Sequence, residues 1–129
     1  MLHHVELYVS NLARSEQFWG WMLEQLGYER YQSWELGFSY RHGKSYLVFV
    51  QAELRYMDQP YHRKRVGLNH LAFHAMSREQ VDELTIALQE RDVTILYAQD
   101  HPFAGGVEHY AVYFEDPDRI KVELVAPGE

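Results

Sequence analysis

Three side chains in this sequence could together hold a metal ion, although they lie far apart along the chain. They are His4, His70 and Glu123, and each occupies the polar side of a segment in which apolar residues alternate with other residues. Two imidazoles and a carboxylate can bind a divalent cation from one side and leave positions open for water or substrate. The pattern also allows a second interpretation, in which both histidines are satisfied polar residues lining a pocket and Glu123 pairs with Lys121.

Residues 4–9 and 68–74 are predicted to form strands, because apolar and polar side chains alternate along both segments. His4 and Glu6 share the polar side of the first segment, and His70 lies on the polar side of the second. An offset of 66 residues superposes the two segments. The two histidines therefore occupy equivalent places in an internal repeat.

The repeat extends over the whole chain and predicts the fold. Each half reads as a strand, a helix and three further strands, with Ser10-Asn11 and Ser77-Arg78-Glu79-Gln80 as predicted helix starts. The later strands are expected near residues 28–33, 36–41 and 46–51, and again near 93–98, 107–114 and 120–125. We expect an α+β fold with two βαβββ modules in tandem, which form a curved mixed sheet around a central cleft with the helices outside. Module one would span residues 1–52, the linker 53–66 and module two 67–129.

A substrate pocket can be predicted from the same patterns. An offset of 74 residues aligns the last strands of the two halves and places Phe49 at the position equivalent to Glu123. Alternation within the later strands leaves four side chains facing inward as predicted pocket residues, namely Phe49, His109, Tyr113 and Lys121. Glu6, two residues from His4, is the candidate general base, and the alternative is a structural acid paired with Lys121.

Composition limits the function classes. The chain has 129 residues and no cysteine, which excludes disulfides, iron–sulfur clusters and a cysteine nucleophile. With 12 basic and 19 acidic residues the net charge is −7, which argues against a nucleic-acid partner, and the basic run at residues 62–65 is interpreted as a solvated loop. We see no signal peptide and no apolar run near the ~20 residues of a membrane span. We therefore expect a cytoplasmic protein with no membrane partner.

Three segments resemble the vicinal oxygen chelate superfamily, which includes glyoxalase I, extradiol dioxygenases, fosfomycin-resistance enzymes and bleomycin-binding proteins. They are residues 4–12 (HVELYVSNL), 69–73 (NHLAF) and 114–124 (FEDPDRIKVEL). The resemblance places the family's metal ligands on His4, His70 and Glu123. It implies a divalent metal (Zn, Mn, Ni or Fe), a small-molecule substrate and a homodimer.

The sequence departs from particular branches of this family. Phe49 stands where the 74-residue offset places the fourth ligand of glyoxalase I. Ala111 and Glu6 replace a Ser and a Thr of the thiol-transferring fosfomycin-resistance branch, and Arg119 replaces the usual Gly after Asp-Pro-Asp. The resemblance thus implies a metal-dependent isomerase, lyase or epoxide-opening enzyme. The alternatives are a metal-free protein that sequesters a ligand, as bleomycin-resistance proteins do, an extradiol-type dioxygenase, and a fosfomycin hydrolase.

Overall fold

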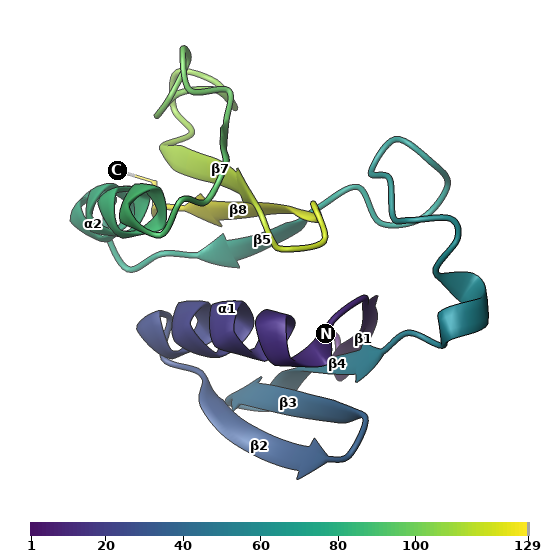
Figure 1. The fold of residues 1–129 in the computed structure, drawn as a ribbon. Helices are drawn as coiled ribbons and strands as arrows, with labels where there is room; N and C mark the ends of the chain where they lie inside the picture. The colour runs from purple at the N-terminus through teal and green to yellow at the C-terminus, as the bar shows by residue number, and fades with distance from the viewer. Residues whose placement is uncertain (129) are drawn as a thin grey trace. The chain divides into compact units, whose positions relative to one another are not determined.

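The computed structural model describes residues 1–128. These residues divide into two compact units, one over residues 1–60 and the other from residue 61 onward. Each unit contains one α-helix and a four-stranded mixed sheet (Figure 1). Neither α-helix in the described part of the chain has the length and apolar character needed to cross a membrane. The prediction of an α+β fold built from two tandem modules is confirmed.

The first unit runs β1 (His4–Val9), α1 (Leu12–Gln25), β2 (Glu29–Trp34), β3 (Gly37–His42) and β4 (Ser45–Gln51). Its sheet has the order β1-β4-β3-β2. The pairing of β1 with β4 is parallel, because the chain crosses over through α1 and the β2–β3 hairpin before β4 returns beside β1. The other pairings are antiparallel. A short 3-10 helix, η1 (Leu54–Tyr56), follows β4.

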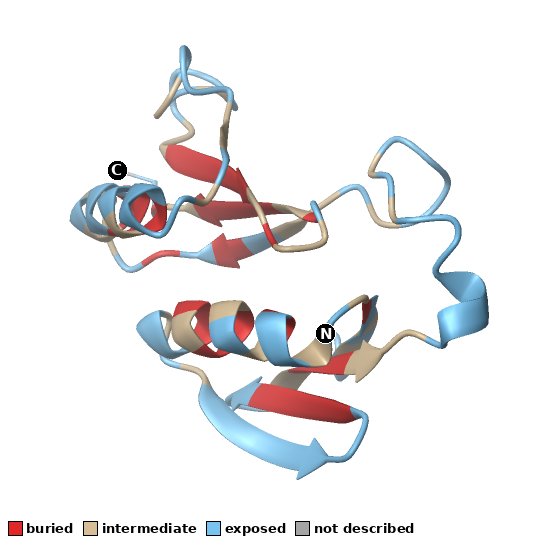
Figure 2. Ribbon diagram, in the orientation of Figure 1, coloured by how far each residue is buried: buried red, intermediate tan, exposed pale blue. Residues whose placement is uncertain are grey.

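The second unit repeats this plan with β5 (Leu71–His74), α2 (Arg78–Glu90), β6 (Ile95–Leu96), β7 (Ala111–Glu115) and β8 (Lys121–Val125). Its sheet has the order β5-β8-β7-β6, again with a parallel pair, β5 and β8, made by the crossover through the helix. The two central strands of each sheet carry most of the buried residues of that sheet (Figure 2).

Each helix covers one face of its own sheet, and apolar side chains fill the space between them. In the first unit Trp19 of α1 lies 5.0 Å, between ring centroids, from Phe49 of β4, which stacks on Phe38 of β3 at 4.9 Å. These three side chains are fully buried. In the second unit α2 supplies Val81, Leu84 and Leu88, and the buried apolar residues of β7 and β8 include Val112, Phe114, Val122 and Leu124. The opposite face of each sheet therefore carries the other set of alternating residues.

Both helices begin and end through local backbone chemistry. Asn11 caps α1 by accepting a hydrogen bond from the Arg14 backbone N–H at 3.1 Å. At the other end Gly27, with φ of 87°, and Tyr28 donate backbone hydrogen bonds back into the last turn, which is a Schellman ending. Ser77 caps α2, as the sequence predicts, by accepting from the Gln80 backbone N–H at 3.1 Å.

We expect Ser77→Ala to lower the free energy of unfolding of the second unit by about 1 kcal/mol, because one backbone N–H in the first turn of α2 loses its acceptor. Ser77→Asp should retain the stability, since an aspartate caps a helix equally well. Thermal denaturation followed by circular dichroism measures both variants. Equal stability of the alanine and aspartate variants would contradict the role given to this side chain.

Strands of the second unit are shorter than the alternation predicts, and β5 begins at Leu71 and not at residue 68. The strand expected at residues 93–98 is reduced to Ile95–Leu96, because Tyr97 has a left-handed φ of 54° that ends the extended backbone. The strand expected at 107–114 begins only at Ala111. Between them the backbone forms successive turns, in which the Gly106 N–H donates to Phe103 O and the His109 N–H donates to Gly106 O. The segment before β7 is therefore a folded loop.

Candidate functional site

A buried carboxylate lies at the centre of the second unit's polar face. Val122 and Leu124 belong to the core between the sheet and α2, so the alternation of β8 turns Glu123 to the opposite side. Glu123 is only 5% exposed. A charge this far from water needs polar partners, because desolvation strongly disfavours an unpaired carboxylate.

Two imidazoles and a phenol surround this carboxylate. Oε1 of Glu123 lies 3.1 Å from Nε2 of His70, and Oε2 is hydrogen-bonded to Nε2 of His109. Tyr113 is the register partner of Glu123 on β7, and its hydroxyl also bonds the carboxylate. We call these four residues, His70, His109, Tyr113 and Glu123, the Glu123 cluster. All four were predicted as site residues, and the structure brings them together within one unit.

The ring of His70 is oriented by its neighbour in the sequence. Its Nδ1 lies 2.7 Å from the amide oxygen of Asn69, so Nδ1 carries the hydrogen that is donated there. A neutral ring with its hydrogen on Nδ1 presents the Nε2 lone pair to the Glu123 oxygen. Two lone pairs that face each other at 3.1 Å need a cation or proton between them. Metal-binding histidines use the same arrangement, with the second nitrogen donating to a carbonyl oxygen.

Tyr113 remains a hydrogen-bond donor at physiological pH. Burial, together with the charge of the neighbouring Glu123 and the hydrogen bond to it, raises the pKa of Tyr113 to about 12. Phenolate formation would place a second negative charge against the carboxylate. The hydroxyl therefore stays protonated and donates to Glu123.

Lys121 does not pair with Glu123. Within residues 1–128 its ammonium donates instead to the hydroxyl of Tyr97 at 3.0 Å and lies 4.9 Å and 5.1 Å from the ring centroids of Tyr97 and Tyr113. This hydrogen bond is the main reason that the pKa of Tyr97 is lowered. The predicted alternative of a Glu123–Lys121 pair is therefore wrong.

Sequence reasoning missed Tyr97 and Asn69 as part of this face. Tyr97 is a loop residue with positive φ, and no periodic pattern in the sequence indicates where the side chain of such a residue points. Asn69 directly precedes His70, and that adjacency was the one available signal. His109 was predicted to face inward from the alternation of a strand over residues 107–114, but it precedes β7 and reaches Glu123 from a turn.

Gly105 has no side chain, and the Glu123 cluster occupies the space that a side chain would fill. A Cβ at this position would lie 2.6 Å from the Tyr113 hydroxyl and would overlap the His109 ring. Its backbone is not in the left-handed region, and the atoms nearest to an added Cβ all belong to these two side chains. The close approach explains why the smallest residue occurs here.

We predict that Gly105→Ala displaces His109 from Glu123 while the sheet remains intact. Loss of a hydrogen bond to a buried charge should cost roughly 1.5–3 kcal/mol. Gly128→Ala is the matched control, because an added Cβ there meets nothing within 4 Å. The histidine ring resonances of the two variants, compared with the parent by NMR, measure the displacement. Unchanged His109 resonances in Gly105→Ala would refute the packing argument.

The remaining predicted site residues, His4 and Glu6, belong to the first unit. Both are exposed and lie on the face of β1 away from α1. The His4 ring stacks on Tyr46, its register partner, with centroids 4.8 Å apart and planes within 5°. Its Nδ1 lies 2.9 Å from Nδ1 of His3. Glu6 is the register partner of Val48.

Phe49 is not a pocket residue, which corrects the prediction. Val5 and Leu71 are equivalent by the 66-residue offset, and their partners in the parallel pairs are Leu47 and Val122. The last strands of the two units are therefore related by an offset of 75 residues and not 74. Val48 is thus the equivalent of Glu123, and Phe49 lies on the helix side against Trp19. A shift of one residue moves a strand side chain to the other face of its sheet. The equivalent position still carries no metal ligand.

The donor chemistry of the Glu123 cluster fits part of a metal site. Among residues 1–128 no three His, Asp or Glu side chains are already arranged to hold an ion. The 3.1 Å between His70 Nε2 and Glu123 Oε1 nevertheless matches two ligands of one ion. At metal–ligand distances near 2.1 Å, adjacent donors lie roughly 3.0–3.4 Å apart. These two residues therefore fit a divalent cation without large movement of either backbone.

Comparison with known proteins places this chain in a family. Residues 1–124 match the Glyoxalase/Bleomycin resistance protein/Dioxygenase superfamily. The chain is 58% identical over 127 residues to a Bacillus subtilis protein called uncharacterized protein YqjT, with 98% of this chain and 99% of that one covered.

Solved structures show the same fold. A Bacillus halodurans protein named as a candidate glyoxalase is 65% identical, with a TM-score of 0.97 over 98% of this chain and 96% of that one. The fosfomycin resistance protein FosX from Listeria monocytogenes is 23% identical, with a TM-score of 0.71 over 100% of this chain and 91% of its own. The tandem modules, the family match over residues 1–124 and these likenesses agree, and the chain belongs to the glyoxalase/bleomycin resistance/dioxygenase superfamily.

Proposed function

We propose that this chain is a metal-dependent enzyme that acts on a small molecule by isomerisation, lyase chemistry or epoxide opening. His70 and Glu123 are the proposed ligands from the second unit. The observation that carries the proposal is the His70 ring, whose Nδ1 is held by Asn69 while Nε2 faces a buried carboxylate oxygen. The family resemblance adds His4 as a third ligand.

A divalent cation held by these residues would supply a Lewis acid that polarises substrate oxygens and stabilises an oxyanion. The protein's own groups would do the remaining work. Asn69 orients the His70 ring, and the protonated Tyr113 hydroxyl donates to Glu123 and keeps its carboxylate in place. Glu6 is the proposed general base, because it lies on the same face of β1 as His4.

A metal-free binding protein is the second candidate, and one observation favours it. The first unit carries a group of neighbouring aromatic rings outside its core. Tyr31 and His4 each contact Tyr46, with ring centroids 5.4 Å and 4.8 Å away, and the Arg41 guanidinium lies over Tyr31 at 4.3 Å. Flat or cationic ligands bind to such surfaces by stacking. This candidate requires no ion at His70 and Glu123.

Metal content of the native, untagged protein separates the two candidates. We expect about one equivalent of Zn, Mn, Ni or Fe per chain in the parent, as a single site requires, with loss in His70→Ala and a clear decrease in His4→Ala. His74→Ala is the matched control, because His74 belongs to β5 but makes no hydrogen bond to Glu123 among residues 1–128. Iron would favour the dioxygenase alternative.

A protein that purifies without metal, and whose melting temperature does not respond to any of the four ions, would refute the enzyme proposal. It would make the metal-free binding protein the better explanation. The homodimer implied by the resemblance is tested separately by sedimentation, in the parent and without added metal.

A further inference from the structure

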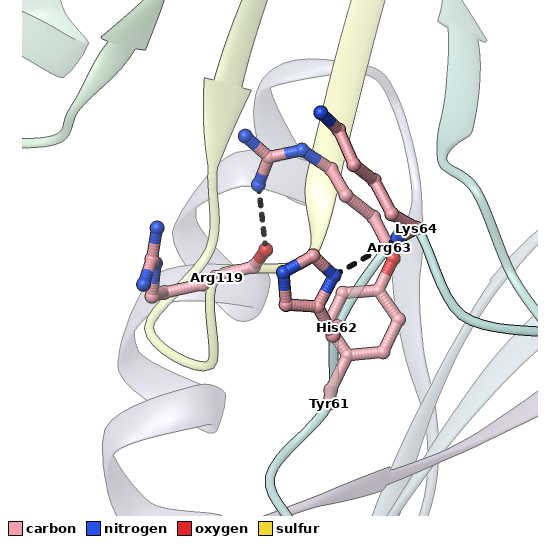
Figure 3. A pocket seen from close by; sticks show the side chains of 5 residues that line it. All are labelled: Tyr61, His62, Arg63, Lys64 and Arg119. Atoms are coloured by element: carbon pink, nitrogen blue, oxygen red, sulfur yellow. Dashed lines mark hydrogen bonds between the residues drawn. The ribbon is translucent and has the colours of Figure 1, made fainter.

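A second polar site lies in the second unit, apart from the Glu123 cluster. Five side chains surround a cavity of about 250 Å³ (Figure 3), and they are Tyr61, His62, Arg63, Lys64 and Arg119. Four are consecutive in the segment that precedes β5, three of them in the basic run at residues 62–65, and the fifth comes from the turn between β7 and β8. We call this the basic cavity.

The basic cavity concentrates positive charge in a chain whose net charge is −7. Arg63, Lys64 and Arg119 are cationic, and one carboxylate, Glu115, bonds two of them, with Oε2 lying 2.9 Å from Arg63 Nη1 and 3.3 Å from Arg119 Nε. The Asp116 carboxylate, whose charge also acts on Tyr61, is a second acid beside the cavity, so three cations against two carboxylates leave a local charge of +1. A phosphate monoester carries about −1.5 to −2 at neutral pH and is therefore opposite in sign to this charge.

Several hydrogen-bond donors of the cavity are left over for a ligand. Within residues 1–128 the Lys64 ammonium makes neither a hydrogen bond nor an ion pair. The His62 ring accepts the Lys64 backbone N–H on Nδ1 at 3.1 Å, so its hydrogen is on Nε2 and can be donated. Each guanidinium has five N–H donors and uses only some of them to bond Glu115. Such donors suit an anion with several acceptor oxygens.

Hydrogen bonds hold Tyr61, Arg63 and the backbone at Arg119 in place before any ligand binds. The Tyr61 hydroxyl donates to Leu68 O at 2.7 Å, and Arg63 Nη1 also lies 3.5 Å from Arg119 O. Arg119 itself has φ of 65°, a left-handed conformation that glycine adopts more readily than arginine. The Asp116 carboxylate fixes this turn by accepting from the backbone N–H of Asp118 and of Ile120. The fold thus holds an arginine where the backbone alone favours glycine.

We propose that the basic cavity binds the phosphate group of a small molecule, either free phosphate or a phosphate monoester. The arginines would hold two of its oxygens through charge-assisted hydrogen bonds, and Lys64 would contribute a third contact. The cavity also has space for part of the molecule that carries the phosphate. The proposal does not depend on a metal at the Glu123 cluster.

The test is calorimetric titration of the full-length protein with inorganic phosphate and with glycerol 3-phosphate, at constant ionic strength and with EDTA present. EDTA removes any metal that could itself bind phosphate, so failure of this proposal and failure of the metal proposal are distinguishable. Arg119→Gly removes one cation at a backbone conformation that suits glycine, so the variant should fold. Lys64→Gln removes another, and Lys44→Gln, in the β3–β4 turn of the first unit, is the matched control.

We expect saturable binding of phosphate to the parent. The affinity should fall about tenfold in Arg119→Gly and in Lys64→Gln, because each variant loses one charge-assisted hydrogen bond. Lys44→Gln should bind as the parent does. Tighter binding of glycerol 3-phosphate than of phosphate would identify a monoester as the ligand, and the reverse order would identify free phosphate. Binding that is absent in the parent, or that falls equally in all three variants, would overturn the proposal.

Discussion

Glu123→Gln is expected to weaken binding of a divalent metal by more than about 100-fold, since even the loss of a residue that only orients a ligand costs roughly 10- to 100-fold. Glutamine keeps the size of the side chain but removes the negative charge that would bind the cation. Its amide can still accept a hydrogen bond from one imidazole, so the fold should survive. The measurement is competition for Zn²⁺ against a chromophoric chelator, with circular dichroism to verify the fold.

Glu115→Gln provides the control for that experiment. Glu115 belongs to β7 and is a mostly buried carboxylate like Glu123, with its side chain 10% exposed. Among residues 1–128 it bonds Arg63 and Arg119 and no histidine. We expect this variant to bind metal as the parent does. Equal metal affinity of the Glu123 and Glu115 variants would show that the Glu123 cluster is not the metal site. It would leave the cluster as a hydrogen-bonded network that stabilises the second unit.

Phe49→Ala is expected to destabilise the first unit by about 3–5 kcal/mol, the usual cost of truncating a buried aromatic ring. Phe49 is fully buried and contacts the rings of Trp19 and Phe38. The cavity left behind would be closed on one side by the helix and on the other by the sheet, so it could collapse only in part. This expectation follows from the core position and contradicts the predicted role of Phe49 as a pocket residue.

Urea unfolding followed by tryptophan fluorescence measures this loss in the correct unit. The chain has three tryptophans, at positions 19, 21 and 34, and all of them belong to the unit Met1–Pro60. Tyr8→Ala is the control, because Tyr8 belongs to the same sheet but is 71% exposed. Tyr8→Ala should lower the free energy of unfolding by less than about 1 kcal/mol, well below the loss expected for Phe49→Ala. A loss of similar size in both variants, or less than about 1 kcal/mol for Phe49→Ala, would contradict the register that places Phe49 against α1.

The fold class and the composition of the second unit's site could both be predicted from the amino-acid sequence. Alternation with period two and helical periodicity depend on which face of each element is buried, and that information is local. The helix starts at Asn11 and Ser77 were predictable for the same reason, because a capping side chain bonds a backbone group only a few residues away. Glu123 was likewise recognisable as a candidate site residue, because a carboxylate interrupts an otherwise apolar strand.

The details that depend on pairing between distant segments required the folded chain. The register between β1 and β4 shows that Phe49 belongs to the core and not to the predicted pocket, because a slip of one residue exchanges the faces of a strand. The alignment of two weakly similar halves does not exclude such a slip. His109 reaches Glu123 through a loop, and Lys121 bonds Tyr97 instead of Glu123, since loop conformation has no periodic signal in the sequence. The basic cavity was not predictable either, because the β7–β8 turn and the run before β5 are brought together only by the folded sheet.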